Sequence, residues 1–312
     1  MSFFDQVVFL GTSSGVPQPG KRNVSSLAIT MRTGRSILVD CGEGTQHQLM
    51  LSKIKLTKID DIFVTHLHGD HCYGIFGLLH SCCMGERTEP ITVYGPKGIK
   101  TMIETVFALS GGWNGYDLRI VELDPTQHSE FTTSSGDVRV HTCPLKHRLP
   151  TLGYRSLKEG RDVTLNDGTL IRAVDVIGEK TKGRTIAVLQ DTCDSSEALP
   201  YLEQPELLIH ECTYHDGMRE KAIEFGHSTA AMAGEFARSC DAKVLALTHF
   251  SPRYNDPDPN DEESPSVQNL RGEALAKAGP TTVVLAAEDF MTLAGLEFTK
   301  VAYDQVARSA VS

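Results

Sequence analysis

Residues 63–79 carry the sequence FVTHLHGDHCYGIFGLL, in which metal-binding side chains gather directly after a short apolar run. The polar members are three histidines and an aspartate, His66, His68, Asp70 and His71. Side chains two residues apart share one face of a strand, so the first three of them are predicted to point the same way. On a helix, at about 100° per residue, His68 would point roughly 200° away from His66. Gly69 permits a sharp turn, from which His71 joins the others at the start of the next helix.

The residue types in this cluster favour a metal site over a solvated polar loop. Neutral imidazole and carboxylate groups bind Zn²⁺, with Mn²⁺ and Fe²⁺ as alternatives. The simpler interpretation, a loop with unrelated surface histidines, does not explain why four ligand-type side chains follow one apolar strand. Four ligands are too few for two hydrolytic metals, so further ligands are expected elsewhere.

Three further candidates end apolar segments far along the chain. They are His147 in CPLKHRLP, Asp191 in VLQDT and His249 in ALTHF. Each one alone is more simply explained as a hydrogen-bonded core or surface residue, but together with the first cluster they favour a shared site. The segments IFVTH (62–66) and VLALTH (244–249) resemble each other, as do ILVDCGEGTQ (37–46) and IAVLQDTCDS (186–195). These echoes predict two βαβ-like halves in a sandwich with a site along one edge.

The rest of the chain alternates between strand-like and helix-like segments without a long linker, which predicts a single α/β domain over residues 1–312. Strands are predicted at 6–11, 26–31, 36–42, 59–66, 90–95, 117–123, 137–145, 152–157, 184–192, 206–214, 242–250 and 281–295, and helices at 72–84, 96–111, 216–225, 228–239 and 266–279. Asp167-Gly168 lies between two alternating runs and predicts a hairpin over 162–171. Residues 255–265 predict an acidic exposed loop.

Composition narrows the class of protein. The formal net charge of −10 argues against a broad nucleic-acid-binding surface but leaves room for a local basic patch. Eight cysteines without a CxxC pair are typical of reduced thiols in an intracellular protein. No apolar run is long enough for a membrane span, and the first residues lack the pattern of a signal peptide. We therefore expect an intracellular protein, most simply in the cytoplasm, with the nucleus or an organelle left open.

A series of motifs resembles the ribonuclease Z family of the metallo-β-lactamase superfamily, in family order and over nearly the whole chain. The matching motifs are FLGTSSGVP, KRNVSSLAI, LVDCGEGTQHQLM, FVTHLHGDHCYGIFGLL, VYGPKGIK, HRLPTLGYR, LQDT, LIHECTY, FGHSTAAMAGEFA, LTHFSPRY and LAAEDFM. The resemblance implies an α/β fold, the αββα sandwich of two mixed β-sheets flanked by helices. It also implies two zinc ions per chain. The implied ligands are His66, His68 and His147 for the first zinc, Asp70, His71 and His249 for the second, and Asp191 as a bridge.

The chemistry expected of this family is phosphodiester hydrolysis. A water between two cations loses a proton near neutral pH and attacks phosphorus, and Asp70 is expected to accept that proton. The resemblance implies His227 as the acid that protonates the leaving 3′-oxygen, oriented by Glu211. Alternatively, His227 is only a neighbour of the residue that caps the next helix and takes no part in the chemistry.

Substrate contacts are predicted at two places. Lys21, Arg22 and Asn23 resemble the family segment near the tRNA acceptor end, although a Lys-Arg pair in a loop is more often a solvated surface. Ser251 and Arg253 follow His249 closely and are predicted to hold the scissile phosphate, with pairing to an acidic neighbour as the alternative for Arg253. The GTSSG sequence lacks the Lys-Ser/Thr of a phosphate loop, so a tight turn beside the site is predicted instead. Asp40 is predicted to be a partner of a ligand histidine.

The resemblance implies a zinc-dependent endoribonuclease that removes 3′ trailers from tRNA precursors and leaves a 3′-hydroxyl, acting as a homodimer. One family feature, a protruding arm that binds tRNA, is predicted to be absent, because Leu157 runs almost directly into Lys158-Glu159-Gly160. Its absence favours a phosphodiesterase for small or unstructured substrates as an alternative. A thioesterase of the glyoxalase II type is less favoured, because its substrate-binding C-terminal helices have no counterpart in this sequence. The non-enzymatic alternative is a metal-bound scaffold in an RNA-processing complex.

Overall fold

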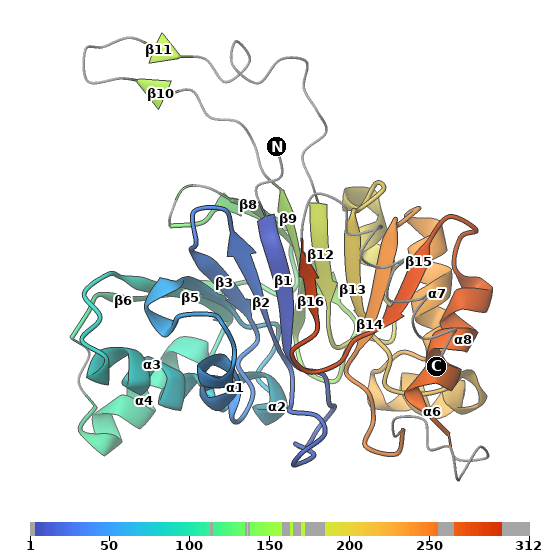
Figure 1. Ribbon diagram of the computed structural model, residues 1–312, viewed down its shortest axis with the longest axis horizontal. Coiled ribbons are helices and arrows are strands. Elements are labelled where there is room, and N and C mark those ends of the chain that lie inside the picture. Colours follow the sequence, from blue (N-terminus) through green and yellow to red (C-terminus); the bar gives the residue numbers. More distant parts are fainter. Residues whose placement is uncertain are drawn as a thin grey trace.

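Two seven-stranded sheets pack face to face, with helices on both outer faces (Figure 1). The structure is a computed structural model, and it describes residues 4–112, 115–134, 136, 138–157, 163–164, 170–171, 185–254 and 265–294. The four layers, helix, sheet, sheet and helix, confirm the predicted αββα sandwich.

Both sheets are mixed. The first has the order β16 (Thr292–Ala294), β1 (Phe4–Gly11), β2 (Ser26–Met31), β3 (Ser36–Val39), β4 (Ile59–Phe63), β5 (Ile91–Pro96) and β6 (Leu118–Leu123). The second has the order β15 (Val283–Ala286), β14 (Val244–Thr248), β13 (Leu207–Glu211), β12 (Thr185–Leu189), β9 (Thr151–Leu157), β8 (Arg139–Leu145) and β7 (Ser129–Thr132). A separate pair, β10 (Val163–Thr164) and β11 (Leu170–Ile171), is antiparallel and confirms the predicted hairpin.

Helices cover the outer face of each sheet (Figure 1). The first sheet carries α1 (Thr45–Leu51), α2 (Gly69–Cys72), α3 (Ile75–Met84) and α4 (Ile99–Ser110), and the second carries α7 (Ala230–Ser239) and α8 (Val267–Lys277), with α6 (Arg219–Phe225) near its lower edge. Short 3₁₀ turns are η1 (Leu56–Lys58), η2 (Ser196–Tyr201) and η3 (Asp216–Met218). None of the described helices is long and apolar enough to cross a membrane.

The alternation of side chains along the strands produces three apolar layers. Residues such as Phe9 and Ile29 of the first sheet meet Ile186 and Ile209 of the second between the sheets. The opposite faces of the strands pack on the helices in two further clusters. This double burial explains why β12, β13 and β14 are buried along their whole length and are apolar except at their ends.

The parallel strands place the polar residues of the sequence motifs at one edge. β3, β4 and β5 are parallel in the first sheet, and β12, β13 and β14 in the second. Asp40, Asp191 and His249 follow β3, β12 and β14 closely, and Glu211 ends β13. In α/β sheets the carboxyl ends of parallel strands are the usual place for a ligand site.

Several element boundaries differ from the sequence-based expectation. β4 ends at Phe63 rather than 66, because Thr65 does not pair with the neighbouring strands. Its backbone N–H donates a hydrogen bond to the Asp40 carboxylate instead. The segment 281–295 forms two strands in different sheets, β15 and β16, rather than one. The strand β7 and the helix α1 were not expected. The predicted absence of the arm near 157–160 and most of the acidic loop at 255–265 lie outside the described residues.

A buried carboxyl group on β4 makes stability depend on pH. Asp61 is fully buried, accepts a hydrogen bond from Ser134 Oγ at 2.7 Å, and has one carboxyl oxygen without a hydrogen-bond partner in the described part of the chain. Burial raises the pKa of Asp61 to about 6. Because the folded protein then holds this proton more tightly than the unfolded chain, ionisation of Asp61 costs stability as pH rises from about 4 to above 6.

We expect Asp61→Asn to stabilise the protein at pH 8 by about 1–3 kcal/mol and to have little effect near pH 4. Asparagine cannot ionise, so the cost of burying the charge disappears. Urea unfolding of both proteins at the two pH values measures this. An equal difference in unfolding free energy at pH 4 and pH 8 would contradict it.

Candidate metal centre and active site

A first group of ligand-type side chains surrounds His68. His66 follows β4, His147 follows β8 and Asp191 follows β12. His68 Nδ1 lies 2.9 Å from His66 Nε2 and 3.2 Å from His147 Nε2. His66 Nε2 lies 3.8 Å from Asp191 Oδ2. These four residues offer one ligand atom each within 4.8 Å of one another, which is a group able to hold a metal ion.

A second group lies on the other side of Asp191. Asp70 and His71 come from the first turn of α2, and His249 follows β14. His71 Nε2 lies 3.2 Å from His249 Nε2 and 3.6 Å from Asp70 Oδ2. The prediction that Asp70 shares a strand face with the first two histidines is wrong, because α2 begins at Gly69. The helix turn brings Asp70 beside His249 instead.

Asp191 faces both groups. Its Oδ2 lies 3.8 Å from His66 Nε2 of the first group and 3.5 Å from His71 Nε2 of the second, and its Oδ1 lies 3.4 Å from His249 Nδ1. Asp191 is buried, and its Oδ1 has no hydrogen-bond partner among the described residues. A buried carboxylate oxygen without a partner is costly unless a cation meets it. The donor set of imidazole and carboxylate together with this oxygen fits a divalent metal.

In two of the histidines, the Nδ1 atom makes a hydrogen bond outside the cluster, which leaves Nε2 facing the other ligand-type side chains. His71 Nδ1 lies 2.7 Å from Asp40 Oδ2, and His147 Nδ1 lies 2.7 Å from the Gly226 carbonyl oxygen. A carboxylate or carbonyl oxygen only accepts, so each Nδ1 donates and Nε2 is left for a ligand role. The predicted contact between Asp40 and one of these histidines is confirmed.

Thr213 is a residue that the sequence interpretation missed. Its hydroxyl donates to Glu211 Oε2 at 2.7 Å and lies 3.0 Å from His249 Nδ1. It stands two residues after Glu211, which ends β13, and this spacing of two is the sequence signal that could have suggested a shared side. Thr213 thereby connects the carboxylate of Glu211 to the imidazole of His249.

His227 stands next to the two metal-binding groups. Its Nδ1 lies 3.0 Å from Glu211 Oε1 and 3.7 Å from Asp191 Oδ2. Burial alone would lower the pKa of His227, but the carboxylates of Glu211 and Asp191 raise it to about 9. His227 also falls within ligand distance of Asp191 and His249, so its geometry allows either a ligand or a proton donor.

An open pocket of about 420 Å³ exposes this cluster to solvent. Its lining residues are Ser14, Gly15, Pro17, Val24, Glu43, His68, Gly69, Asp70, Tyr73, Asp191, His227 and His249. The backbone N–H of Gly15 donates to Asp70 Oδ2 at 2.7 Å, and Gly15 has a φ of 74°. The predicted tight turn beside the site is therefore confirmed.

Arg22 is not placed to contact a substrate phosphate, which corrects the sequence-based expectation. Its side chain is buried, with 5% of the residue exposed. The guanidinium donates to Thr12 Oγ1 at 2.8 Å and to the Ala287 carbonyl at 2.7 Å, and it stacks on Phe250. Arg22 thus connects the loop after β1 to the segment after β15.

We expect Arg22→Ala to destabilise the fold by about 2–4 kcal/mol, because two buried acceptors lose a charged donor. Urea unfolding measures this change. Lys21→Ala, at the neighbouring exposed residue, is the matched control and should change stability by less than about 0.5 kcal/mol. Equal unfolding free energies for Arg22→Ala and wild type would contradict the structural role.

Three other predicted substrate residues, Asn23, Ser251 and Arg253, lie outside the lining of the open pocket. Asn23 donates its side-chain N–H to the Glu43 carbonyl at 2.9 Å. Ser251 is buried and accepts from Arg253 Nε at 3.1 Å, while Arg253 itself is exposed and stacks on Tyr214. None of these three lines the pocket directly.

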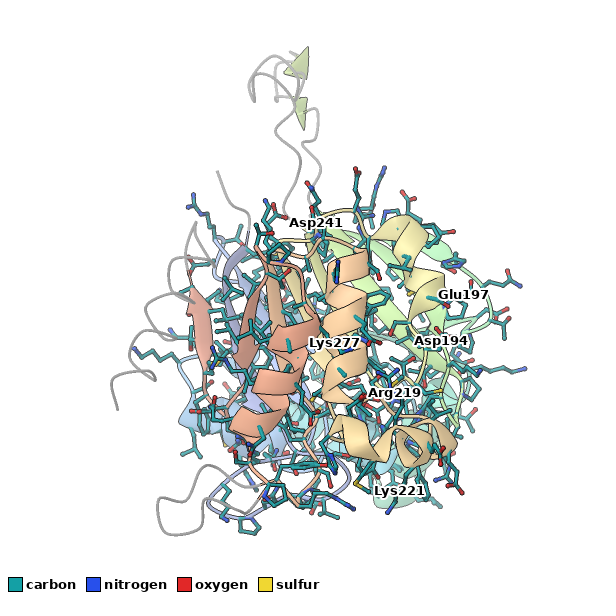
Figure 2. All side chains as sticks on the ribbon, turned by 90° about the vertical axis from the view of Figure 1, so that its right-hand side faces the viewer. Asp194, Glu197, Arg219, Lys221, Asp241 and Lys277 are labelled. Carbon is teal, nitrogen blue, oxygen red and sulfur yellow. The ribbon has the colours of Figure 1, made fainter. Side chains whose placement is uncertain are left out.

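Exposed cations flank the site in spite of the acidic composition. Arg148 directly follows His147, and its guanidinium lies 5.8 Å from the centre of the Phe225 ring. Lys221 lies 5.9 Å from the same ring centre. Figure 2 shows Lys221 at the lower edge of the face covered by α6, α7 and α8, with Arg219 above it. This local patch is the kind that phosphate binding requires.

Comparisons with known proteins agree with the fold and the site. Residues 35–250 match the beta-lactamase superfamily domain. The αββα sandwich, with histidines and aspartates gathered at one edge of its sheets, defines a metal-binding hydrolase fold of that class. Ribonuclease BN of Erwinia tasmaniensis is 39% identical, over 79% of this chain and 89% of its own length. Ribonuclease Z of Bacillus licheniformis is 40% identical, over 80% of this chain and 89% of its own length.

A solved structure supports the same assignment. The crystal structure of human tRNase Z, short form, superposes with a TM-score of 0.72 at 31% identity, and covers 93% of this chain and 98% of that one. The chain belongs to the ribonuclease Z family of the beta-lactamase superfamily.

Proposed function

We propose that this protein is a metal-dependent endoribonuclease that removes 3′ trailers from tRNA precursors. Its relatives are named ribonuclease Z and ribonuclease BN, and its structural neighbour is a tRNase Z. The observation that carries the proposal is the convergence of six ligand-type side chains from distant parts of the chain around a seventh, Asp191.

Two zinc ions fit this donor set best. His66, His68 and His147 would hold the first, and Asp70, His71 and His249 the second, with Asp191 between them. Mn²⁺ and Fe²⁺ are alternatives with the same ligand types. When bound, such ions lower the pKa of water and neutralise charge on the phosphoryl oxygens.

The protein residues have separate roles in this proposal. Asp70 accepts the proton of the attacking water, and the Gly15 N–H holds its carboxylate in place. His227 donates a proton to the leaving 3′-oxygen. Glu211 holds His227 through its Nδ1, so the other ring nitrogen remains for the substrate. Arg148 and Lys221 would attract the RNA backbone to this edge.

The second candidate is a phosphodiesterase for small or unstructured substrates. It is favoured by the acidic net charge, and it would be favoured further by the predicted absence of the arm near 157–160, which lies outside the described residues. A homodimer and a cytoplasmic location also belong to the proposal, because the family resemblance implies the first and tRNA processing needs access to precursor RNA.

Cleavage of a 3′-extended tRNA precursor, mapped to the nucleotide, tests the proposal. We expect one cut at the 3′ end of the tRNA part, leaving a 3′-hydroxyl and a 5′-phosphorylated trailer, and no cut with chelator. Bis-p-nitrophenyl phosphate serves as the comparison substrate. Hydrolysis of the small diester without cleavage of the precursor would favour the second candidate, and neither activity despite bound metal would favour a scaffold.

A further inference from the structure

A large aromatic side chain stands exposed at the mouth of the pocket. Tyr73 follows α2 directly and has 61% of its surface exposed. It lines the same pocket as His68, Asp70 and His227. Single exposed aromatic residues are common on protein surfaces, so exposure alone assigns no role. Its position beside the proposed metal ligands is what distinguishes Tyr73.

The ring of Tyr73 is held in a defined place by Gly69. A Cβ atom at Gly69 would lie 2.4 to 2.8 Å from three ring carbons of Tyr73, so the ring occupies the space that a side chain would fill. Gly69 begins α2 and does not have a positive φ, so the sharp turn expected there is not the reason for glycine. Glycine instead lets the ring lie on the backbone one helical turn before it.

The pocket therefore has two chemically different parts. Histidines and aspartates form one part, which suits a phosphate held by metal ions. The rest of the lining includes the exposed ring of Tyr73, the apolar side chains of Pro17 and Val24, and Glu43. An exposed aromatic ring in the same pocket as a phosphate site matches a nucleotide, whose base has an aromatic face and whose phosphate is charged.

We propose that Tyr73 is the stacking platform for a nucleobase next to the scissile phosphate. The inference rests on the proposed ribonuclease function and adds a substrate-binding residue to it. Single-stranded RNA is bound by stacking unpaired bases on aromatic side chains, largely without regard to sequence. The preference would thus be for an unpaired 3′ extension rather than for a particular base.

A cycle of two changes tests this stacking. One change is Tyr73→Ala, and the other replaces the two nucleotides that flank the cleavage position by abasic ribose. We expect each change alone to lower kcat/KM by about 5- to 150-fold, the range for one stacked base. Together they should lower it little further, because both remove the same contact. Tyr73→Phe should retain most of the activity, because it keeps the ring.

The control variant is Tyr201→Ala, at a partly exposed tyrosine on η2 outside the pocket, and it should cleave both substrates like wild type. Metal content and thermal unfolding of Tyr73→Ala should equal those of wild type, because the side chain is exposed. Multiplicative losses in the double change would overturn the inference, as would a Tyr73→Phe variant as defective as Tyr73→Ala. A wild-type protein that cleaves no RNA would overturn the proposed function as well, whereas the first two results leave that function intact.

Discussion

Asp191→Asn is expected to release metal and to lower turnover by at least about 10³-fold, the equivalent of several kcal/mol of lost transition-state stabilisation. Asp191 contacts both groups of the proposed ligand set, because its Oδ2 faces His66 of the first group and His71 of the second, and its Oδ1 faces His249 of the second. Asparagine keeps the size of the side chain but removes the charge and one of the two acceptor oxygens. The experiment measures the number of metal ions per chain by mass spectrometry, together with the rate of RNA cleavage.

The matched control for this variant is Asp194→Asn. Asp194 lies three residues further along the same loop, is exposed on the face shown in Figure 2, and accepts a hydrogen bond from the Ser196 backbone. It should retain metal and activity. If Asp191→Asn kept two metals per chain and the full rate, the proposed arrangement around Asp191 would be wrong.

His227→Ala is expected to lower the rate of RNA cleavage by about 10²–10⁴-fold while both metals stay bound. The reason is the loss of a proton donor beside the leaving 3′-oxygen, a role for which the ring is oriented by the hydrogen bond that His227 Nδ1 donates to Glu211 Oε1. A p-nitrophenyl leaving group departs as an anion and needs no proton. Hydrolysis of bis-p-nitrophenyl phosphate should therefore change much less than RNA cleavage.

The ligand alternative for His227 predicts a different result. Asp191, His227 and His249 lie close enough together to form a metal-binding group. If His227→Ala lost one metal and cleaved RNA and bis-p-nitrophenyl phosphate with equally reduced rates, His227 would be a metal ligand. The proton donor would then have to be another group. Glu211→Gln serves as the companion variant, and a loss of about 10–100-fold is expected if Glu211 only positions the imidazole.

Most strands and helices were predictable because their signals are local, whereas the αββα layering was implied by the family resemblance. Continuous apolar runs predicted β12, β13 and β14, and Asp167-Gly168 predicted the hairpin of β10 and β11. The boundary of β4 was not predictable, since Asp40, a residue distant in sequence, captures the Thr65 N–H and ends the ladder. The division of 281–295 between two sheets likewise depends on β1, which pairs with β16.

The sequence by itself determined the α/β class and four ligand-type residues, because strand periodicity and the HxHxDH spacing are properties of neighbouring positions, whereas the αββα sandwich and the full ligand set were implied by the family resemblance. Tertiary structure alone decided how those residues are used. It turned Arg22 inward to Thr12 and Ala287, tied His147 to the Gly226 carbonyl, and laid the Tyr73 ring on Gly69. Each of these depends on which distant backbone group comes within hydrogen-bond or van der Waals distance, and no local pattern encodes that distance.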